Sequence, residues 1–366
     1  MQLSALRLKN FRCYQNVTLT PPEGITVIAG ENGTGKTNLL EAVHLCCLGR
    51  SHRTSADADM IKNGEETAAA QLTVQKRDGR HDVGVRLFMS QRRRKLCYVN
   101  GKTASRIGDL MGHATCVMFS PEDLGLIREG PGVRRRYMDM LLSQLQPAYF
   151  FALTQYNAAL KQRNALLKEQ HGPQPDSQLD VWDEQLALAA EPLVRLRAQA
   201  AEKIGVRARL HYSAISGRDN EALTVRYRTQ LDRGDPREQL LELLRARRAD
   251  DLRRLATTVG PHRDDLTLLL SQMELQAYGS QGQARTAALA LKLAAFDLLN
   301  EEQGEPPLLL LDDVLSELDP LRRRRLIERV RGAQALLTCT DVTDLNGADP
   351  NCVLTVENGV INTLRG

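Results

Sequence analysis

The sequence predicts an α/β fold in which a P-loop head carries an antiparallel β subdomain and is interrupted by an inserted, mainly helical lobe. Residues 30–37 read Gly-x-x-x-x-Gly-Lys-Thr between an apolar strand pattern and a helical pattern, which is the arrangement of a P-loop. Residues 68–99 alternate between apolar and polar side chains, as antiparallel strands do. A helical pattern then continues from residue 120 to about residue 255. We therefore expect a split head formed by residues 1–119 and 256–366, with the lobe inserted between its halves.

Composition places the chain among ordinary globular proteins. Its 366 residues are 42% hydrophobic and 26% charged, and the formal net charge is only +4. The seven cysteines are an odd number without a Cys-x-x-Cys pair, so we expect reduced thiols instead of a disulfide frame or a zinc site. The sequence has no apolar run long enough for a membrane helix, and its first residues lack a signal-peptide pattern. We expect a cytoplasmic protein with no membrane contact.

The P-loop follows strand patterns at residues 3–8, 17–19 and 24–29. Its glycines let the backbone turn tightly with the amides facing inward around phosphates, at the N-terminus of the next helix. Lys36 would place a charge on the β- and γ-phosphates, and Thr37 would offer a hydroxyl to Mg²⁺. The nucleotide contacts that we predict here are Gly30, Glu31, Asn32, Gly33, Thr34, Gly35, Lys36, Thr37 and Asn38.

Basic side chains gather at two places before the helical region. One group follows the P-loop helix, which should end near Gly49, and consists of Arg50, His52 and Arg53. The other occupies the expected tip of a hairpin and consists of Arg92, Arg93, Arg94 and Lys95. Both groups are candidates for phosphate contacts, and a solvated basic face is the alternative for each of them.

The inserted region reads as helices packed on one another. Apolar residues step by three or four along residues 149–167 and again along residues 178–211, which predicts two amphipathic helices in antiparallel contact. Arg134, Arg135 and Arg136 lie near a helix start, where the helix dipole disfavours cations, so an anionic group should face them. A carboxylate within the fold is the simpler candidate. The strand pattern at residues 266–270 is expected to return to the head.

Three segments near the end of the chain complete the set of motifs. The apolar run at residues 308–311 ends in Asp312 and Asp313, as a buried parallel strand with a Walker B motif would. Asp312 would hold Mg²⁺ through a water molecule, and Asp313 would orient the attacking water. A Ser-x-Gly-Gln segment at residues 280–283 precedes a helix, and a Ser-Glu-Leu-Asp segment at residues 316–319 follows Walker B.

In this order, the motifs resemble those of ATP-binding-cassette ATPase heads. Further segments resemble the RecF family of bacterial recombination mediators, which are SMC-like proteins of this class. They are Pro121-Glu122, Gly130-Pro131-Gly132-Val133-Arg134-Arg135-Arg136-Tyr137-Met138-Asp139, Leu160-Lys161-Gln162-Arg163-Asn164 and Gly260-Pro261-His262-Arg263-Asp264-Asp265. The resemblance spans nearly the whole chain.

The resemblance implies an ATP-dependent homodimer that clamps duplex DNA or a single-strand/duplex junction. It also implies that RecO and RecR are partners in loading a recombinase, and that a weak, DNA-stimulated ATPase acts as a switch. Arg12 would reach the phosphates, Lys36, Asp312 and Asp313 would serve hydrolysis, and Asp319 would lie at the dimer contact. Ser280, Gly282 and Gln283 would engage the ATP of the other protomer. The two basic groups would contact DNA without reading its sequence.

Some features depart from the broader cassette pattern. Asp313 stands where a glutamate is usual, which fits slow turnover and leaves the identity of the base open. The sensor position after the strand at residues 335–340 holds no histidine, so Thr340 or Asp341 would have to replace it, and no Q-loop glutamine is evident near Ser120. Two other classes of protein remain open: an ABC-transporter ATPase subunit and a P-loop small-molecule kinase.

Overall fold

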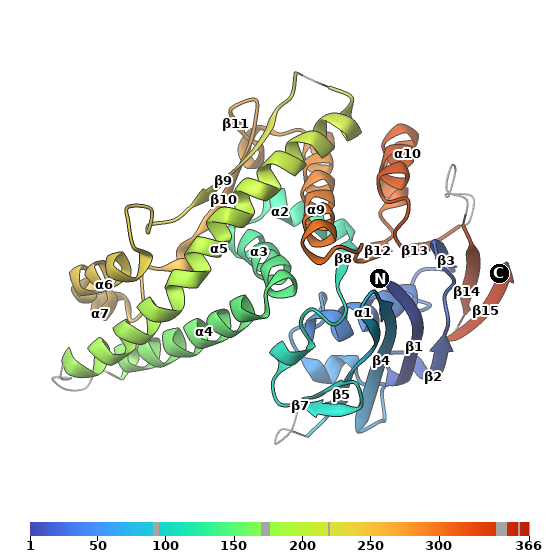
Figure 1. The fold of residues 1–366 in the computed structure, drawn as a ribbon, viewed down its shortest axis with the longest axis horizontal. Coiled ribbons are helices and arrows are strands. Elements are labelled where there is room, and N and C mark those ends of the chain that lie inside the picture. Colours follow the sequence, from blue (N-terminus) through green and yellow to red (C-terminus); the bar gives the residue numbers. More distant parts are fainter. Residues whose placement is uncertain (91–94, 170–175, 219, 342–349, 358, 366) are drawn as a thin grey trace.

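The computed structural model describes the chain apart from residues 91–94, 170–175, 219, 342–349, 358 and 366. It contains a head, in which both ends of the chain lie, and an elongated helical lobe that extends to one side (Figure 1). The α/β fold class predicted from the sequence is confirmed.

A six-stranded sheet in the order β15-β14-β3-β13-β12-β8 forms the centre of the head. Its strands are β3 (Ile25–Ala29), β8 (Cys116–Phe119), β12 (Leu308–Asp312), β13 (Ala335–Cys339), β14 (Cys352–Glu357) and β15 (Val360–Arg365). All neighbouring pairs are parallel except β14 and β15. The apolar runs of β8, β12 and β13 are buried along their whole length because both faces of the sheet are covered.

A second six-stranded sheet is antiparallel and has the order β2-β1-β4-β5-β6-β7. Its strands are β1 (Gln2–Phe11), β2 (Tyr14–Leu19), β4 (Thr67–Lys76), β5 (Gly79–Phe88), β6 (Lys95–Val99) and β7 (Lys102–Ala104). This sheet is the β subdomain that the alternating pattern predicted. Its inner face shares a hydrophobic core with α1 (Lys36–Leu48) and one face of the central sheet.

Helices make up most of the lobe. They are α2 (Gly125–Arg128), α3 (Pro131–Leu145), α4 (Pro147–Lys168), α5 (Asp176–Ser216), α6 (Pro236–Ala246) and α7 (Arg248–Arg254). The long helices α4 and α5 lie side by side and antiparallel, as their apolar stripes predicted (Figure 1).

Short 3-10 turns occur in both the head and the lobe. They cover Asp57–Met60, Ile107–Leu110, Pro121–Leu124, Pro261–Arg263 and Leu315–Glu317.

The three arginines at the start of α3 find oxygen partners within the fold. Arg134 binds both carboxylate oxygens of Asp265 through Nε and Nη2, at 2.7 and 2.9 Å. Arg135 donates to the main-chain oxygen of Asp264 at 2.7 Å, and Arg136 donates to that of Ser51 at 3.3 Å. The carboxylate expected opposite this cluster is therefore present for Arg134.

Residues 266–270 do not return to the head, so that expectation was wrong. They belong to β10 (Asp265–Leu270), which pairs with β9 (Leu223–Arg228) and β11 (Met273–Glu274) in a third sheet beside α5. An apolar strand pattern indicates burial but does not specify a partner strand, and here the partner is supplied by the lobe. The pairing carries the lobe past residue 255 to the short helix α8 (Leu275–Tyr278).

Helix α9 (Gln281–Gln303) then connects the lobe to the head, and α10 (Pro320–Arg329) follows Walker B. The ammonium of Lys292 on α9 donates to the main-chain oxygen of Met118 at 2.8 Å and pairs with Asp123 at 2.6 Å. The Tyr137 hydroxyl of α3 donates to the main-chain oxygen of Leu291 at 2.6 Å. Helix α9 is therefore fixed to both parts.

All seven cysteines are free thiols, as expected, and only Cys13 is not buried. Within the ranges that the structure describes, no group of acidic, cysteine and histidine residues could hold a metal ion in the manner of a zinc site. None of the helices in these ranges has the length and apolar character of a membrane span.

Candidate nucleotide-binding site

The P-loop connects β3 to α1 in a conformation that requires glycine. Gly30, Gly33 and Gly35 have φ angles of 154°, 83° and 115°. At Gly35 space is also limiting, because a Cβ atom there would lie 2.5 Å from the Cys13 sulfur. The Tyr14 hydroxyl donates to the main-chain oxygen of Gly35 at 2.9 Å, so the first residue of β2 holds the loop from outside.

Lys36 reaches back across the loop that precedes it. Its ammonium donates to the main-chain oxygens of Gly30 at 2.5 Å and Glu31 at 3.0 Å, and the residue is 5% exposed. The positive charge is thus held against the loop that leads into the N-terminus of α1. This arrangement suits the phosphates of a nucleotide.

Thr37 and Asp312 lie next to each other at the carboxyl end of the central sheet, although 275 positions separate them in the sequence. The Thr37 hydroxyl donates to Asp312 Oδ1 at 2.8 Å, because α1 starts beside the end of β12. The same carboxylate oxygen accepts a hydrogen bond from the Thr338 hydroxyl of β13, also at 2.8 Å. Hydroxyl and carboxylate oxygens are the ligands that Mg²⁺ prefers, so this pair fits the predicted metal site.

Asp313 follows Walker B in a strained conformation, with a φ angle of 53° that non-glycine residues rarely adopt. Its amide donates to the Thr338 hydroxyl oxygen at 3.0 Å, and its main-chain oxygen accepts from Ser316 at 2.7 Å. Its carboxylate oxygen Oδ1 is buried and has no hydrogen-bond partner among the described residues. A buried acceptor without a partner beside a metal site is suited to bind a water molecule there.

Arg12 lies beside the P-loop but is engaged by a carboxylate of α1. It donates from Nε and Nη2 to both oxygens of Glu41 at 2.8 Å, and from Nη1 to the main-chain oxygen of Asp59 at 2.6 Å. The hydrogen bonds to Glu41 and the nearby charges of Glu41 and Asp59 outweigh burial and raise the pKa of Arg12. Burial alone would raise the pKa of Glu41, but hydrogen bonds from Arg12 and Ser51 outweigh burial and leave it lowered. Arg12 is thus positioned one helical turn from the loop.

The side chain of Asn38 forms hydrogen bonds with two residues near the P-loop. Its Nδ2 donates to the Cys13 sulfur at 3.4 Å, and its Oδ1 accepts a hydrogen bond from Arg53 at 3.2 Å. It therefore links the turn after β1 to the segment that follows α1.

The Ser-x-Gly-Gln segment forms the exposed start of α9. The Ser280 hydroxyl accepts from the Gln283 amide at 3.2 Å, and the Gln283 side chain accepts from the Ser280 amide at 2.8 Å. Gly282 lies close to Arg322, whose guanidinium would be 3.7 Å from a Cβ at that position. Arg322 in turn pairs with Asp319, the N-cap of α10, at 2.7 Å. The two motifs are thus neighbours on one surface.

That surface is separate from the P-loop of the same chain. Helix α1 and the beginning of α9 lie well apart in Figure 1. Within the described ranges, no hydrogen bond joins residues 280–283 to residues 30–38.

The predicted phosphate contacts differ in their surroundings. Arg50 and Arg53 are exposed. His52 packs edge-on against His44, and burial lowers its pKa, although the nearby charges of Glu41 and Asp312 oppose that change. Lys95 pairs with Asp57 at 2.7 Å and donates to the main-chain oxygen of Gly49 at 2.8 Å, so its charge is already compensated. Arg92, Arg93 and Arg94 lie outside the described residues.

Sequence reasoning missed two residues that organise the site. Thr338 binds both Walker B aspartates, and the only signal for it was a hydroxyl within the apolar run of β13. Glu41 is buried in α1, and no local motif marked it. The sensor candidates Thr340 and Asp341 follow β13 and are exposed, and no glutamine occupies the end of β8, where Ser120 begins a short turn.

Comparison with known proteins agrees with this geometry. Residues 2–362 match the family model described as the RecF/RecN/SMC N terminal domain. The DNA replication and repair protein RecF of Symbiobacterium thermophilum is 43% identical over 355 residues, which cover 94% of this chain and 93% of that protein. RecF of Clostridium perfringens is 37% identical over 365 residues, which cover 99% of both.

Solved structures give the same result. A structure of the recombination mediator RecF with ATPrS, from the RecFOR pathway, is 34% identical with a TM-score of 0.92 and covers 99% of this chain and 98% of that one. An Smc head bound to part of ScpA has a TM-score of 0.58 at 17% identity, covers 100% of this chain and 97% of that one, and supports the fold alone. This chain therefore belongs to the RecF/RecN/SMC family, and its near full-length similarity places it among the RecF proteins.

Proposed function

We propose that this protein binds ATP and Mg²⁺ at the P-loop, and that two ATP molecules join two copies of it into a dimer on DNA. It would act in DNA replication and recombinational repair and help to load a recombinase together with RecO and RecR. Support comes from relatives named DNA replication and repair protein RecF and from a similar structure named RecF-ATP in the RecFOR pathway.

The proposal of a dimer rests on where two parts of the site lie. The phosphate cradle and the exposed helix start at Ser280 belong to one chain but lie on separate parts of it. The first-turn amides of α9 are a site for a negatively charged group, and a second copy could bring them to a γ-phosphate held by Lys36. Each ATP would then be enclosed by two chains.

Hydrolysis would release the dimer. Asp313, whose buried carboxylate oxygen Oδ1 has no hydrogen-bond partner within the described ranges, would orient the attacking water, while Mg²⁺ held by Thr37 and Asp312 would neutralise charge on the phosphates. Its side chain is one methylene shorter than glutamate. We therefore propose a slow ATPase that DNA stimulates and that works as a switch.

DNA would contact the exposed cations after α1. Arg50 and Arg53 are suited to phosphate contacts, and Arg92, Arg93 and Arg94 remain part of the proposal. His52 and Lys95 are the weaker members, since one is packed against His44 and the other is paired with Asp57. Phosphate contacts give an affinity for DNA that falls steeply with salt.

The dimer is tested by sedimentation of the protein with and without ATP and Mg²⁺. We expect the wild type to double its mass with ATP, and we expect Lys36→Arg and Ser280→Arg to stay monomeric. Gln185→Arg adds the same charge at an exposed position of α5 and should dimerise normally. ATP-dependent dimerisation of Ser280→Arg would contradict the shared site.

DNA binding is tested by titrating labelled duplex at two salt concentrations with ATP present. We expect affinity to fall by at least about tenfold between 50 and 200 mM salt if several phosphates are contacted.

An ATPase activity stimulated by a metabolite but not by DNA would favour the kinase alternative. Copurification with a membrane fraction would favour the transporter alternative.

A further inference from the structure

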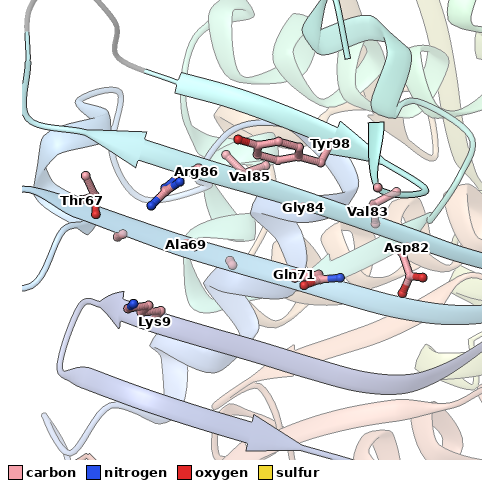
Figure 2. A pocket seen from close by; sticks show the side chains of 13 residues that line it. Lys9, Thr67, Ala69, Gln71, Asp82, Val83, Gly84, Val85, Arg86 and Tyr98 are labelled. Carbon is pink, nitrogen blue, oxygen red and sulfur yellow. The ribbon is translucent and has the colours of Figure 1, made fainter. Parts of the chain in front are cut away.

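The outer face of the antiparallel sheet has a pocket of about 320 Å³. It lies over β1, β4, β5 and β6, on the face opposite the core that these strands share with α1 (Figure 2). The pocket is separate from the P-loop, and neither the sequence motifs nor the proposed dimer makes use of it.

Strand register explains why the sheet is hollow at this point. Lys9, Ala69 and Arg86 are paired in one row across three strands. In the next row, Gln71 pairs with Gly84 and Gly84 pairs with Tyr98. Ala69 and Gly84 are thus short residues placed between longer ones, and their missing side chains leave the space. Since neighbouring strands are about 4.8 Å apart, the backbones of Lys9 and Arg86 lie roughly 10 Å apart.

Gly84 is not required by the backbone. Its φ lies outside the left-handed region, so other residues could adopt the same conformation. A Cβ at this position would lie 3.3 Å from the main-chain oxygen of Ala70, so the neighbouring strand would have to shift by a few tenths of an ångström. The absence of a side chain keeps the pocket open, and a side chain there would narrow it.

The lining changes in chemistry from one end to the other. Lys9, Thr67 and Arg86 lie toward one end, and Gln71 and Asp82 lie toward the other, with Tyr98 between them on the far strand (Figure 2). Within the described part of the chain, neither Lys9 nor Arg86 has a carboxylate partner. Asp82, in contrast, accepts from Thr73 at 2.6 Å and pairs with Arg80 at 3.2 Å. The charge of Asp82 is thus compensated by Arg80, and the end at Lys9 and Arg86 holds the cations that no described carboxylate neutralises.

This combination matches the parts of a nucleotide. The Arg86 guanidinium lies over the Phe88 ring at 5.8 Å, but among the described residues no carboxylate neutralises Lys9 or Arg86, so both suit a phosphate group. A tyrosine ring suits stacking with a planar base. An exposed amide such as that of Gln71 can donate to and accept from the edge of a base. Because Asp82 is paired with Arg80 at the other end, the favoured orientation is the one in which the phosphate lies between Lys9 and Arg86.

We propose that this pocket takes one unpaired nucleotide of a DNA strand, with its phosphate between Lys9 and Arg86 and its base against Tyr98. The inference rests on the proposed DNA binding for its biological setting. It adds a structural preference to that function, because a base inside a duplex has its faces covered and cannot enter. A single-strand tail beside a duplex would supply both the unpaired nucleotide and the phosphates of the main contact surface.

Photocrosslinking tests the site directly and does not require ATP or a dimer. The probe is an oligonucleotide in which one unpaired position carries 5-iododeoxyuridine. We expect the crosslinked peptide to contain Tyr98, and we expect the yield to fall at least fivefold in Ala69→Leu, which fills the pocket without removing a charge. Crosslinks that map elsewhere, or that persist in Ala69→Leu, would overturn the proposal.

Equilibrium binding tests the consequence for substrate choice. A DNA hairpin with a short single-strand tail is compared with the same hairpin made blunt, in the presence of ATP. We expect the wild type to favour the tailed hairpin by at least about fivefold, the lower end of what stacking of one base contributes. Ala69→Leu and Tyr98→Leu should remove the preference while leaving the affinity for the blunt hairpin unchanged.

The two proposals fail in different ways. Arg209→Gln changes an exposed cation on α5 and should leave both affinities as in the wild type. Equal binding of both hairpins by the wild type would overturn the pocket and leave the ATP-dependent dimer in place. Loss of ATP-dependent dimerisation, with Tyr98 still crosslinked, would overturn the clamp and support the pocket.

Discussion

At the scale of single residues, Glu41 joins the parts that surround the P-loop. Its carboxylate is fully buried and accepts hydrogen bonds from Arg12 of the β1–β2 turn and from Ser51 beyond α1, and Arg53 approaches to 4.0 Å. Two segments, the β1–β2 turn and the residues that follow α1, are therefore positioned by one negative charge. Its partners favour the ionised form and lower its pKa despite burial.

Replacement of Glu41 by glutamine should reduce stability in a pH-dependent way. A carboxyl whose pKa is lower in the folded protein stabilises the fold at pH values above its unfolded pKa of about 4.3, and the contribution is lost as pH falls through the folded pKa. We expect Glu41→Gln to lose about 1–3 kcal/mol of unfolding free energy at pH 7. The difference from the wild type should shrink below about pH 4.3.

Urea unfolding at a series of pH values between 7 and 3.5 measures this effect. Glu66→Gln replaces an exposed carboxylate with an amide and serves as the control. A difference between Glu41→Gln and the wild type that stays constant across the series would argue against an ionised Glu41 as the source.

Residue chemistry also decides which parts of the site the sequence could predict. Lys36 and Thr37 belong to a contiguous motif whose spacing is set by phosphate geometry, so their roles could be read locally. Thr338 and Glu41 act through partners far away in the chain, and the pairing of β13 with β12 had to be known first. Charge alone did not reveal that Lys95 is paired with Asp57, because Asp57 lies in a separate turn.

At the scale of elements, a buried ion cluster fixes the lobe helices. Arg163 of α4 is 0% exposed and donates from Nε to Asp183 of α5 at 2.6 Å. Its Nη1 donates to Asp251 of α7 at 2.7 Å and to the Thr257 hydroxyl at 2.9 Å. The cluster specifies how three helices meet, which their apolar stripes alone could not.

Replacement of Arg163 by methionine should destabilise the protein strongly. It would leave Asp183 and Asp251 buried with fewer partners, and breaking a buried pair in this way typically costs about 3–5 kcal/mol. Lys161→Met makes a similar change at an exposed position of the same helix and should cost little. Denaturant unfolding compares the two variants, and equal midpoints would mean that the cluster does not stabilise the lobe.

Element patterns predicted the type of secondary structure better than its partners. The apolar stripes of α4 and α5 were sufficient to predict their antiparallel contact, because few other surfaces could bury both. The strand at residues 266–270 was predicted correctly as a strand and placed in the wrong sheet. Strand pairing depends on register between distant segments, and the apolar pattern of residues 266–270 did not show that β9 and β11 would be their partners.

At the scale of the whole molecule, head and lobe share one hydrophobic core. Val27 and Leu309 of the central sheet belong to the same cluster of buried side chains as Tyr156 and Leu193 of the lobe. Helix α9 passes between the two parts and is bonded to both. The split domain organisation in sequence therefore does not imply two independent folding units.

A core substitution in the head should accordingly lower the stability of the lobe. Trp182 is the single tryptophan of the chain and packs against the shared core from α5, so its fluorescence reports on the lobe. Leu309→Ala removes a fully buried side chain from β12 and should cost about 2–5 kcal/mol. If the parts unfold together, the Trp182 transition and the far-ultraviolet circular dichroism transition should shift by the same amount in denaturant.

Leu364→Ala is the control, because this residue of β15 is 65% exposed, and it should shift neither transition. A Trp182 transition that stays at the wild-type midpoint in Leu309→Ala would mean that the lobe unfolds independently of the head.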